Sequence, residues 1–281
     1  MKYLILLSFF LTVLLVSCKE KDQSMSGGKL FIIGGGNKTD SIMNELVELA
    51  GVRDRGYLFI LPMASSVPDS AIIWAKEDFA RTGIRKMTGY NFSKGETVPQ
   101  PQLDSLRSAP LIFISGGDQS RFMDAVLNTK VRDAILEAYH KGAVISGTSA
   151  GAAVMSRKMI TGNQLKHTGI EGSFPTIEAG NVEIKEGLGF LTGTIIDQHF
   201  IKRQRLNRLI SVCIENPGEQ CVGIDESTAI VVEGSQARIT GEGQVVVIRN
   251  KGVKNTNSRG LLGASDLEIT IYLPGDKFSI R

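Results

Sequence analysis

The stretch Ala143-Val144-Ile145-Ser146-Gly147-Thr148-Ser149-Ala150-Gly151 decides the fold class of this chain. Its apolar start leads directly into a G-x-S-x-G pattern, which is typical of a serine on a sharp turn between a buried strand and a helix. The glycines suit such a turn because the serine needs backbone angles that most side chains forbid and small neighbours that let a carbonyl approach. The N–H of Ala150 would then point at the oxygen that becomes negative. Small residues also gather where a helix packs closely on a strand, so a catalytic serine needs a base and an acid beside it.

On both sides of this stretch, apolar runs alternate with helical segments, as in a mostly parallel sheet with helices on both faces. Strands are predicted at 29–34, 57–61, 84–90 and 110–115, and helices at 41–50, 69–81, 120–127 and 130–139. From residue 192 onward, short strands at 194–197 and 221–224 flank a helix, and further strands follow at 229–233, 244–249 and 267–273. We therefore predict one α/β domain over 29–281, flavodoxin-like or class I glutamine amidotransferase-like, with an antiparallel β-rich C-terminal part.

The N-terminus predicts export. Residues 1–17 combine Lys2, a short apolar stretch and a small-residue junction, which is the pattern of a secretory signal. Cys18 directly follows Leu-Val-Ser and resembles the bacterial lipobox, in which the cysteine becomes the lipidated first residue. Residues 18–28 then read as a flexible tether. We expect an exported protein, lipid-anchored on the periplasmic or surface face of the cell envelope; an ordinary signal or a crude membrane anchor is the alternative.

Charge and cysteine content exclude several classes of function. Lysine and arginine together number 32 against 29 aspartates and glutamates, so no bulk attraction to nucleic acid is implied. Apart from Cys18 the chain has only Cys213 and Cys221, which are too few and too widely spaced for a zinc site. In an exported chain these two could form a disulfide, but we expect buried free thiols. The single tryptophan, Trp74, and the scarcity of aromatic residues argue against a sugar-stacking surface.

A glycine run at 34–36 invites comparison with nucleotide-binding loops. A dinucleotide fingerprint starting at Gly34 needs a small third glycine where Thr39 stands, and a P-loop needs glycine where Asn37 stands. We therefore expect these glycines to form a tight turn and no nucleotide site. The glycine pair at 116–117 also follows a predicted strand, and it could expose backbone N–H groups toward an oxyanion near the serine.

One of the three histidines is placed to serve as the general base. His140 lies at the end of a predicted helix, where the helix dipole favours it, and His167 lies in a polar loop. His199 follows the apolar run 194–196, at the end of a predicted strand and on the edge where Ser149 emerges. His199 is therefore the predicted base.

An acid is then needed to fix the imidazole tautomer. The segment 223–229 supplies two carboxylates, Asp225 and Glu226, at the end of another short strand. One of them could turn toward His199 while the other caps or is solvated. The order serine, histidine, acid departs from that of α/β-hydrolases, which disfavours an esterase but is compatible with a triad.

A basic segment, 202–209, lies between the predicted base and the predicted acid. On a helical wheel Arg203 and Arg205 flank the apolar face, and Arg208 lies roughly opposite to it. The arginines fit either a solvated helix surface or a cluster that recognises carboxylates by paired hydrogen bonds.

Together these residues resemble the cyanophycinases, within the serine peptidase family that also contains aspartyl dipeptidase. The resemblance covers essentially the whole mature chain and rests on six segments in this order: Phe31-Ile-Ile-Gly-Gly-Gly36, Leu61-Pro-Met-Ala-Ser65, Ile114-Ser-Gly-Gly-Asp-Gln119, Gly147-Thr-Ser-Ala-Gly-Ala152, Asp197-Gln-His-Phe200 and Gly223-Ile-Asp-Glu226. It implies an α/β fold with Ser149 as nucleophile, His199 as base and Glu226 as acid. It also implies that three residues donate backbone N–H groups to the oxyanion: Gly117, Asp118 and Ala150. The substrate contacts that it implies are Gln119, Asp197, Gln198, Arg203, Arg205 and Arg208. All three arginines stand at the cyanophycinase spacing, a run that the aspartyl dipeptidase pattern lacks.

The resemblance implies a reaction, hydrolysis of a β-aspartyl-arginine polymer to dipeptides through an acyl-enzyme. Asp197 suits a substrate arginine, and the arginines suit free α-carboxylates. No cofactor or metal is implied, and the expected partners are a peptide or isopeptide substrate, with a homodimer possible and the membrane reached only through the lipid. The polymer is stored inside cells, so a protein in the envelope would scavenge released polymer or act on another isopeptide. The alternatives are an aspartyl or isoaspartyl dipeptidase and a non-catalytic binding protein, and the polar stretch 156–186 could form a lid.

Overall fold

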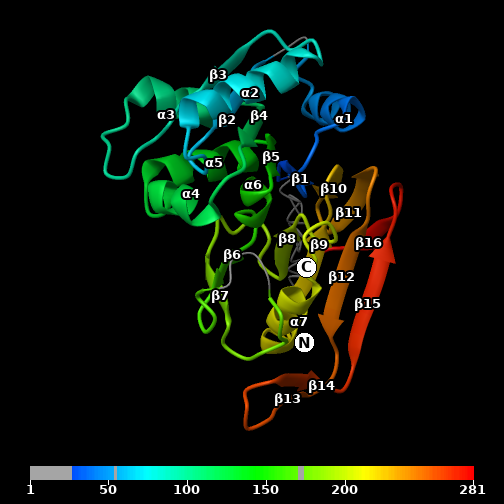
Figure 1. The fold of residues 1–281 in the computed structure, drawn as a ribbon. Coiled ribbons are helices and arrows are strands. Elements are labelled where there is room, and N and C mark those ends of the chain that lie inside the picture. Colours follow the sequence, from blue (N-terminus) through cyan, green and yellow to red (C-terminus); the bar gives the residue numbers. More distant parts are fainter. Residues whose placement is uncertain (1–26, 54–55, 170–173) are drawn as a thin grey trace, which may run out of the picture.

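The computed structural model describes residues 27–53, 56–169 and 174–281 (Figure 1). The predicted signal, Cys18 and most of the predicted tether lie outside the described residues. Within the described ranges, no helix combines the length and the apolar character that crossing a membrane requires.

The main sheet of the described chain has the order β16-β11-β10-β1-β5-β4-β2-β3. Its parallel part consists of β3 (Met87–Gly89), β2 (Leu58–Leu61), β4 (Leu111–Ile114), β5 (Val144–Thr148) and β1 (Lys29–Ile33). Its antiparallel part continues from β1 with β10 (Thr228–Glu233), β11 (Gln236–Gly241) and β16 (Lys277–Ser279). The fold is thus the predicted mixed α/β type, a mostly parallel sheet with antiparallel strands from the C-terminal part. A flavodoxin-like sheet has the strand order 2-1-3-4-5. The parallel part here has the order β3-β2-β4-β5-β1. If counting starts at β2, the first four places match 2-1-3-4, but the fifth place is taken by β1, the first strand of the chain.

Helices cover both faces of this sheet. Successive strand residues point to opposite faces, so Phe31 and Ile33 join one buried cluster while Leu30 and Ile32 join another. The first cluster includes residues of α1 (Asp40–Ala50) and α2 (Pro68–Ala80). The second includes residues of α3 (Gln100–Arg107), α4 (Gln119–Val126), α5 (Lys130–His140) and α6 (Ala150–Ala153). Apolar contacts therefore fix the parallel strands from both sides, and their carboxyl ends remain as the open edge.

A second, smaller sheet has the order β15-β12-β9-β8. Its strands are β8 (Thr194–Gln198), β9 (Gln220–Ile224), β12 (Val245–Asn250) and β15 (Leu267–Tyr272), and α7 (Leu206–Glu215) packs on it around a third buried cluster. Two antiparallel pairs complete the structure, β6 (Lys158–Gln164) with β7 (Val182–Glu186) and β13 (Lys254–Thr256) with β14 (Leu262–Ala264). The polar stretch 156–186, expected as a possible lid, thus contributes the β6–β7 pair beside β8 (Figure 1).

The two sheets meet where β1 and β8 end. The sequence predicted that His199 and Ser149 emerge on one edge, and the strand that leads to His199 belongs instead to the second sheet. The N–H of His199 nevertheless donates to the carbonyl of Gly34 over 2.7 Å, directly after β1. The site therefore forms between two sheets rather than along one.

Candidate active site

Ser149 lies on a strained turn between β5 and α6. Its φ of +55° and ψ of −111° lie outside the regions that residues with a side chain usually adopt. The turn is closely packed, because a Cβ on Gly147 would lie 2.1 Å from the carbonyl oxygen of Gly151, and one on Gly151 would lie 2.4 Å from that of Ile114. Both glycines of the G-x-S-x-G pattern are therefore needed for the turn that lifts the serine.

His199 contacts both Ser149 and Glu226. Its Nε2 lies 2.8 Å from Oγ of Ser149, and its Nδ1 lies 2.6 Å from Oε1 of Glu226. The other candidate acid, Asp225, accepts the N–H groups of Ile201 and Lys202 over 3.1 and 2.9 Å. The structure thus brings the predicted serine, base and glutamate together, while Asp225 holds the turn that follows the histidine.

The other two histidines lie elsewhere. His140 is the last residue of α5. His167 places Nε2 2.7 Å from Oε2 of Glu178, whose pKa is lowered to about 2 by hydrogen bonds from His167 and Lys166. Neither histidine contacts Ser149.

The end of β1 fixes the backbone of all three elements of the site. Three successive carbonyls accept N–H groups: that of Ile33 from Ser149 over 3.0 Å, that of Gly34 from His199 over 2.7 Å, and that of Gly35 from Ser227 over 2.9 Å. His199 and Ser227 both have positive φ values, of 48° and 51°, as Ser149 does. The strained backbone of the site is therefore held by one short loop.

The sequence predicted a tight turn for the glycines of this loop, and their contact with the histidine was missed. A Cβ on Gly35 would lie 2.3 Å from Cε1 of His199, and one on Gly36 would lie 2.7 Å from Cβ of Glu226. The imidazole and the glutamate thus pack against bare backbone. A glycine run directly after the first strand was the available signal.

Burial lowers the pKa of His199 below its ordinary value, the hydrogen bond that it donates to Glu226 opposes this, and the charges of Arg203 and Arg205 lower the pKa further. The pKa of Glu226 is lowered, chiefly by its hydrogen bond with His199. Near neutral pH the imidazole is therefore uncharged and the glutamate ionised. In that state Nδ1–H donates to Glu226 and Nε2 can accept the proton of Ser149.

Of the three predicted oxyanion donors, one N–H group already donates to a backbone carbonyl and two have no acceptor among the described residues. The N–H of Asp118 donates to the carbonyl of Ala64 over 2.8 Å, so it is already used, and the assignment of Asp118 as a donor is corrected. Its carboxylate caps α4 instead, accepting the N–H groups of Ser120 and Arg121. Among the hydrogen bonds of the described chain, none uses the N–H of Gly117 or Ala150. These two N–H groups remain for an oxyanion beside Ser149.

The predicted substrate-contacting residues lie between β8, α7 and β6, and most of them bind one another. Asp197 and Arg208 form a buried, two-pronged ion pair, with Nε 2.7 Å from Oδ2 and Nη2 bonded to Oδ1. Gln119 donates its amide to the carbonyls of Ile160 and Thr161 over 2.9 and 2.6 Å. Asp197 is thus held by this chain's own arginine rather than left open for one from a substrate.

The position of Arg208 corrects the helical-wheel prediction. The helix begins at Leu206 rather than Lys202, and Arg208 is 1% exposed although the wheel placed it opposite the apolar face. Its guanidinium lies 5.5 Å from the ring centre of Phe174, and the pairing with Asp197 compensates its burial.

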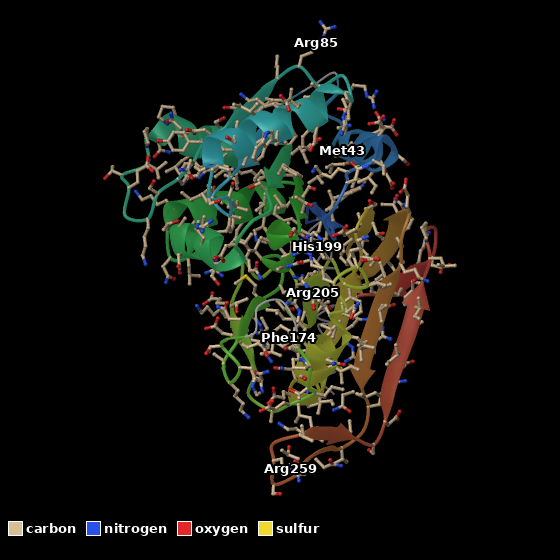
Figure 2. All side chains as sticks on the ribbon, in the orientation of Figure 1. Met43, Arg85, Phe174, His199, Arg205 and Arg259 are labelled. Carbon is tan, nitrogen blue, oxygen red and sulfur yellow. The ribbon has the colours of Figure 1, made fainter. Side chains whose placement is uncertain are left out.

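Arg205 is the buried arginine with unused hydrogen-bonding capacity. Its Nη1 donates to the carbonyl of Gln198 over 2.6 Å and to the side-chain oxygen of the same residue, whereas Nε, also buried, has no partner in the described chain. Burial, then repulsion from Arg208, lowers the pKa of Arg205 to about 10, so the group stays charged at neutral pH. Figure 2 labels it beside His199, on the segment that joins β8 to α7. A buried cation with a free donor suits an anionic group of a ligand; Arg203, by contrast, is exposed.

No group of three or more His, Cys, Asp or Glu side chains in the described ranges is arranged to hold a metal ion. Cys213 and Cys221 are free and buried, as predicted.

Comparison with known proteins adds family information to this geometry. The model of a family described as "Peptidase family S51" matches residues 30–240. The cyanophycinase of Nostoc sp. (strain PCC 7120) is 32% identical over 236 residues, which cover 80% of this chain and 76% of the relative. The cyanophycinase of Synechococcus elongatus is 29% identical over 265 residues, covering 90% and 80%.

More distant similarities concern other peptidases. Peptidase E of Pasteurella multocida is 26% identical over 150 residues, covering 50% of this chain and 58% of the relative. The crystal structure of a peptidase from an acI-B1 Actinobacterium has a TM-score of 0.66 at 21% identity and covers 90% of this chain and 97% of that one. At this identity the structural likeness shows the fold alone.

Proposed function

The chain belongs to peptidase family S51 and is a serine-type peptidase, and from this premise we propose that it hydrolyses a β-aspartyl-arginine polymer to dipeptides. The observation that carries the proposal is the hydrogen-bonded series Ser149, His199 and Glu226, together with the similarity to two cyanophycinases over most of the chain. The peptidase E relative matches only half of the chain, so an aspartyl or isoaspartyl dipeptidase is the second candidate.

In the proposed reaction, His199 is the general base and Ser149 the nucleophile. Nε2 of His199 takes the proton of the serine hydroxyl while Oγ attacks the carbonyl carbon of the scissile bond. The carbonyl oxygen becomes negative and accepts hydrogen bonds from the N–H groups of Gly117 and Ala150. Glu226 holds the imidazole in the tautomer with the proton on Nδ1 and stabilises its charged form.

The tetrahedral intermediate then collapses. The bond to the leaving nitrogen breaks, and His199 gives its proton to that nitrogen, which departs as an amine. Water attacks the resulting ester on Ser149, again losing a proton to His199, and Oγ recovers that proton when the acid is released. The serine ends as it began, and the sum of the steps is peptide hydrolysis.

Substrate recognition is proposed to centre on Arg205 and Arg203. Arg205 offers its free Nε inside the site, and Arg203 lies exposed on the same segment, so both can bind carboxylates of an aspartyl substrate. The Asp197–Arg208 pair holds this segment in position and does not contact the substrate in the state described. Gln119 supports the site by holding β6.

The proposal is tested by incubating a fragment that starts at Gly27 with the purified polymer and identifying products by mass spectrometry. The wild type is expected to release β-aspartyl-arginine, and Ser149→Ala is expected to lose roughly 10⁴- to 10⁶-fold in rate. Rapid cleavage of short aspartyl peptides with no release from the polymer would favour the dipeptidase instead. Undiminished hydrolysis by Ser149→Ala would remove the nucleophile assignment.

We also propose that the chain is exported and lipid-anchored through Cys18. The signal-like residues 1–17 and the Leu-Val-Ser-Cys junction support this. In a bacterial host the full chain is expected to fractionate with membranes, and Cys18→Ser is expected to move it out of that fraction. A wild-type chain found wholly in the soluble fraction would contradict the anchor.

A further inference from the structure

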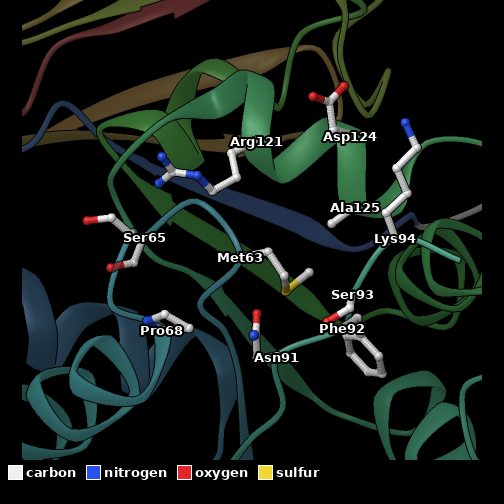
Figure 3. A pocket seen from close by; sticks show the side chains of 11 residues that line it. Met63, Ser65, Pro68, Asn91, Phe92, Ser93, Lys94, Arg121, Asp124 and Ala125 are labelled. Atoms are coloured by element: carbon white, nitrogen blue, oxygen red, sulfur yellow. The ribbon is translucent and has the colours of Figure 1, made fainter. Parts of the chain in front are cut away.

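A hollow of about 460 Å³ lies at the carboxyl ends of β2 and β3, beside the start of α4. Figure 3 shows Met63 near its centre, Ser65 and Arg121 on one side, and Lys94 and Asp124 on the other. Its volume is in the range of ligand-binding pockets. The mechanism proposed above uses none of these side chains.

This hollow continues in two directions. Ser93 and Ala125 also line a neighbouring hollow of about 380 Å³, which extends past the end of α4 to Val131 at the start of α5. In the other direction Ser65 lines a smaller hollow of about 140 Å³ that reaches Gly116 and Thr148. Shared lining residues place the three hollows side by side, and Thr148, at the edge of the smallest one, is covalently next to the nucleophile. We call this surface the α4 groove.

The α4 groove carries charges of both signs that form no ion pair among the described residues. Lys94, Arg121 and Asp124 are exposed, and none of them takes part in an ion pair among the described residues. Arg121 donates Nη1 to the carbonyl of Ala64 over 3.0 Å, which orients the guanidinium at the end of the groove nearer the nucleophile. The floor is apolar, formed in part by Met63 and Phe92, both buried.

We propose that the α4 groove binds the part of a peptide polymer that extends beyond the dipeptide being released. The inference rests on the proposed function, because it takes the substrate to be a chain that repeats one carboxylate and one guanidinium. Arg121 and Lys94 bind carboxylates of such a chain, and Asp124 binds a guanidinium. The apolar floor covers the methylene stem of an arginine side chain. A dipeptide substrate engages only the surroundings of Ser149, so the groove selects polymer over short peptides.

Lys94→Glu and Asp124→Lys test the groove, because both side chains are exposed and unpaired and their replacement leaves the core intact. Lys277→Glu is the matched control, because Lys277 on β16 is exposed and forms no ion pair within the described ranges. For each protein the ratio of kcat/KM on the polymer to kcat/KM on a two-unit peptide with one scissile bond is measured. We expect each groove variant to lower this ratio about threefold to tenfold, since a surface attraction becomes a repulsion. The control ratio is expected to stay at the wild-type value.

Binding supplies a second readout, because Trp74 is the only tryptophan and lines the small hollow beside Thr148. In a Ser149→Ala background, adding the polymer is expected to change the tryptophan emission, and the groove variants are expected to need more polymer for the same change. Dipeptide release from the polymer with wild-type ratios in both groove variants overturns the groove while the proposed function stands. Failure of the wild type to release dipeptides from the polymer overturns both.

Discussion

His199 lies between groups that move its pKa in opposite directions, and the pH dependence of the reaction follows from them. The base works unprotonated, so a lowered pKa keeps activity at lower pH. We expect the acid limb of kcat/KM to have its midpoint below the ordinary histidine value of 6.5. Arg203→Gln removes a positive charge that lowers the pKa of His199, so the midpoint of the acid limb is expected to move to higher pH. Glu226→Gln removes the interactions that raise it and is expected to move the limb downward, with a rate loss of up to about 10⁴. Shifts of the two variants in the same direction would contradict this account.

Gly35 is expected to be required for activity because a side chain there has no room beside the imidazole. Gly35→Ala would place a methyl group 2.3 Å from Cε1 of His199, and a displacement of about 1 Å can cost roughly 10² in rate. The matched control is Gly51→Ala, since Gly51 also has a positive φ but has nothing within 4 Å of an added Cβ. Both variants should lose some stability in urea unfolding. Only Gly35→Ala should lose kcat, and equal activity of the two would refute the positioning role.

At the scale of single residues, the sequence predicted the catalytic residues better than the residues that hold them in position. Ser149 and His199 stand at strand ends, which pattern reading can find; it left Asp225 and Glu226 open as the acid, the family resemblance implied Glu226, and the structure places Ser149, His199 and Glu226 in contact. Gly35 was overlooked because its role depends on an imidazole more than 160 residues away along the chain. The assignment of Asp118 as an oxyanion donor was wrong for a similar reason. Its N–H donates to the carbonyl of Ala64, a residue distant in the sequence, and only the fold shows this contact.

At the scale of elements, the Asp197–Arg208 pair joins β8 to α7. Arg208→Met would leave the buried carboxylate without its partner and is expected to destabilise the protein by about 3–5 kcal/mol. The double variant Asp197→Leu with Arg208→Met removes both charges and is expected to recover much of that loss. Urea unfolding followed by circular dichroism measures both. If Arg208→Met kept wild-type stability and raised only KM, the pair would be a substrate site rather than a structural joint.

The helical wheel of α7 failed for a local reason. It began at Lys202, but Asp225 takes the N–H groups of Ile201 and Lys202, and Gln204 has a φ of +52°, so the chain turns before the helix starts. The helix α3 and the β6–β7 pair were also absent from the prediction. Their segments are polar and lack the apolar runs on which the other elements were recognised.

At the scale of the whole molecule, the first strand, β1, lies in the interior of the main sheet, next to a strand of the C-terminal part. β1 pairs with β5 on one side and with β10 on the other, so the C-terminal strands complete the sheet that the N-terminal half begins. We expect a single cooperative unfolding transition in which far-UV circular dichroism and peptidase activity are lost together. A chain truncated after Glu226 is expected to show no cooperative transition. Two separate transitions in the intact chain would show that the two sheets fold independently.

The alternation of apolar runs and helices was sufficient to predict the parallel part of the main sheet, because strands buried on both faces read as continuous apolar segments. The second sheet could not be predicted in the same way. β8 and β9 contain short apolar runs like those of the main sheet, and the sheet that they join is decided by the pairing of β8 with β9 and of β9 with β12.

The loop at 33–35, whose carbonyls hold the backbones of Ser149, His199 and Ser227, also sets when activity can begin. The ribosome makes this loop early, the serine midway, and the histidine and glutamate late. A nascent chain that has reached the nucleophile still lacks the base and the acid, and the strand after Glu226 must return to β1 before they are held in place. Peptidase activity is therefore delayed by the connectivity of the fold until the strand after Glu226 has been made and has paired with β1.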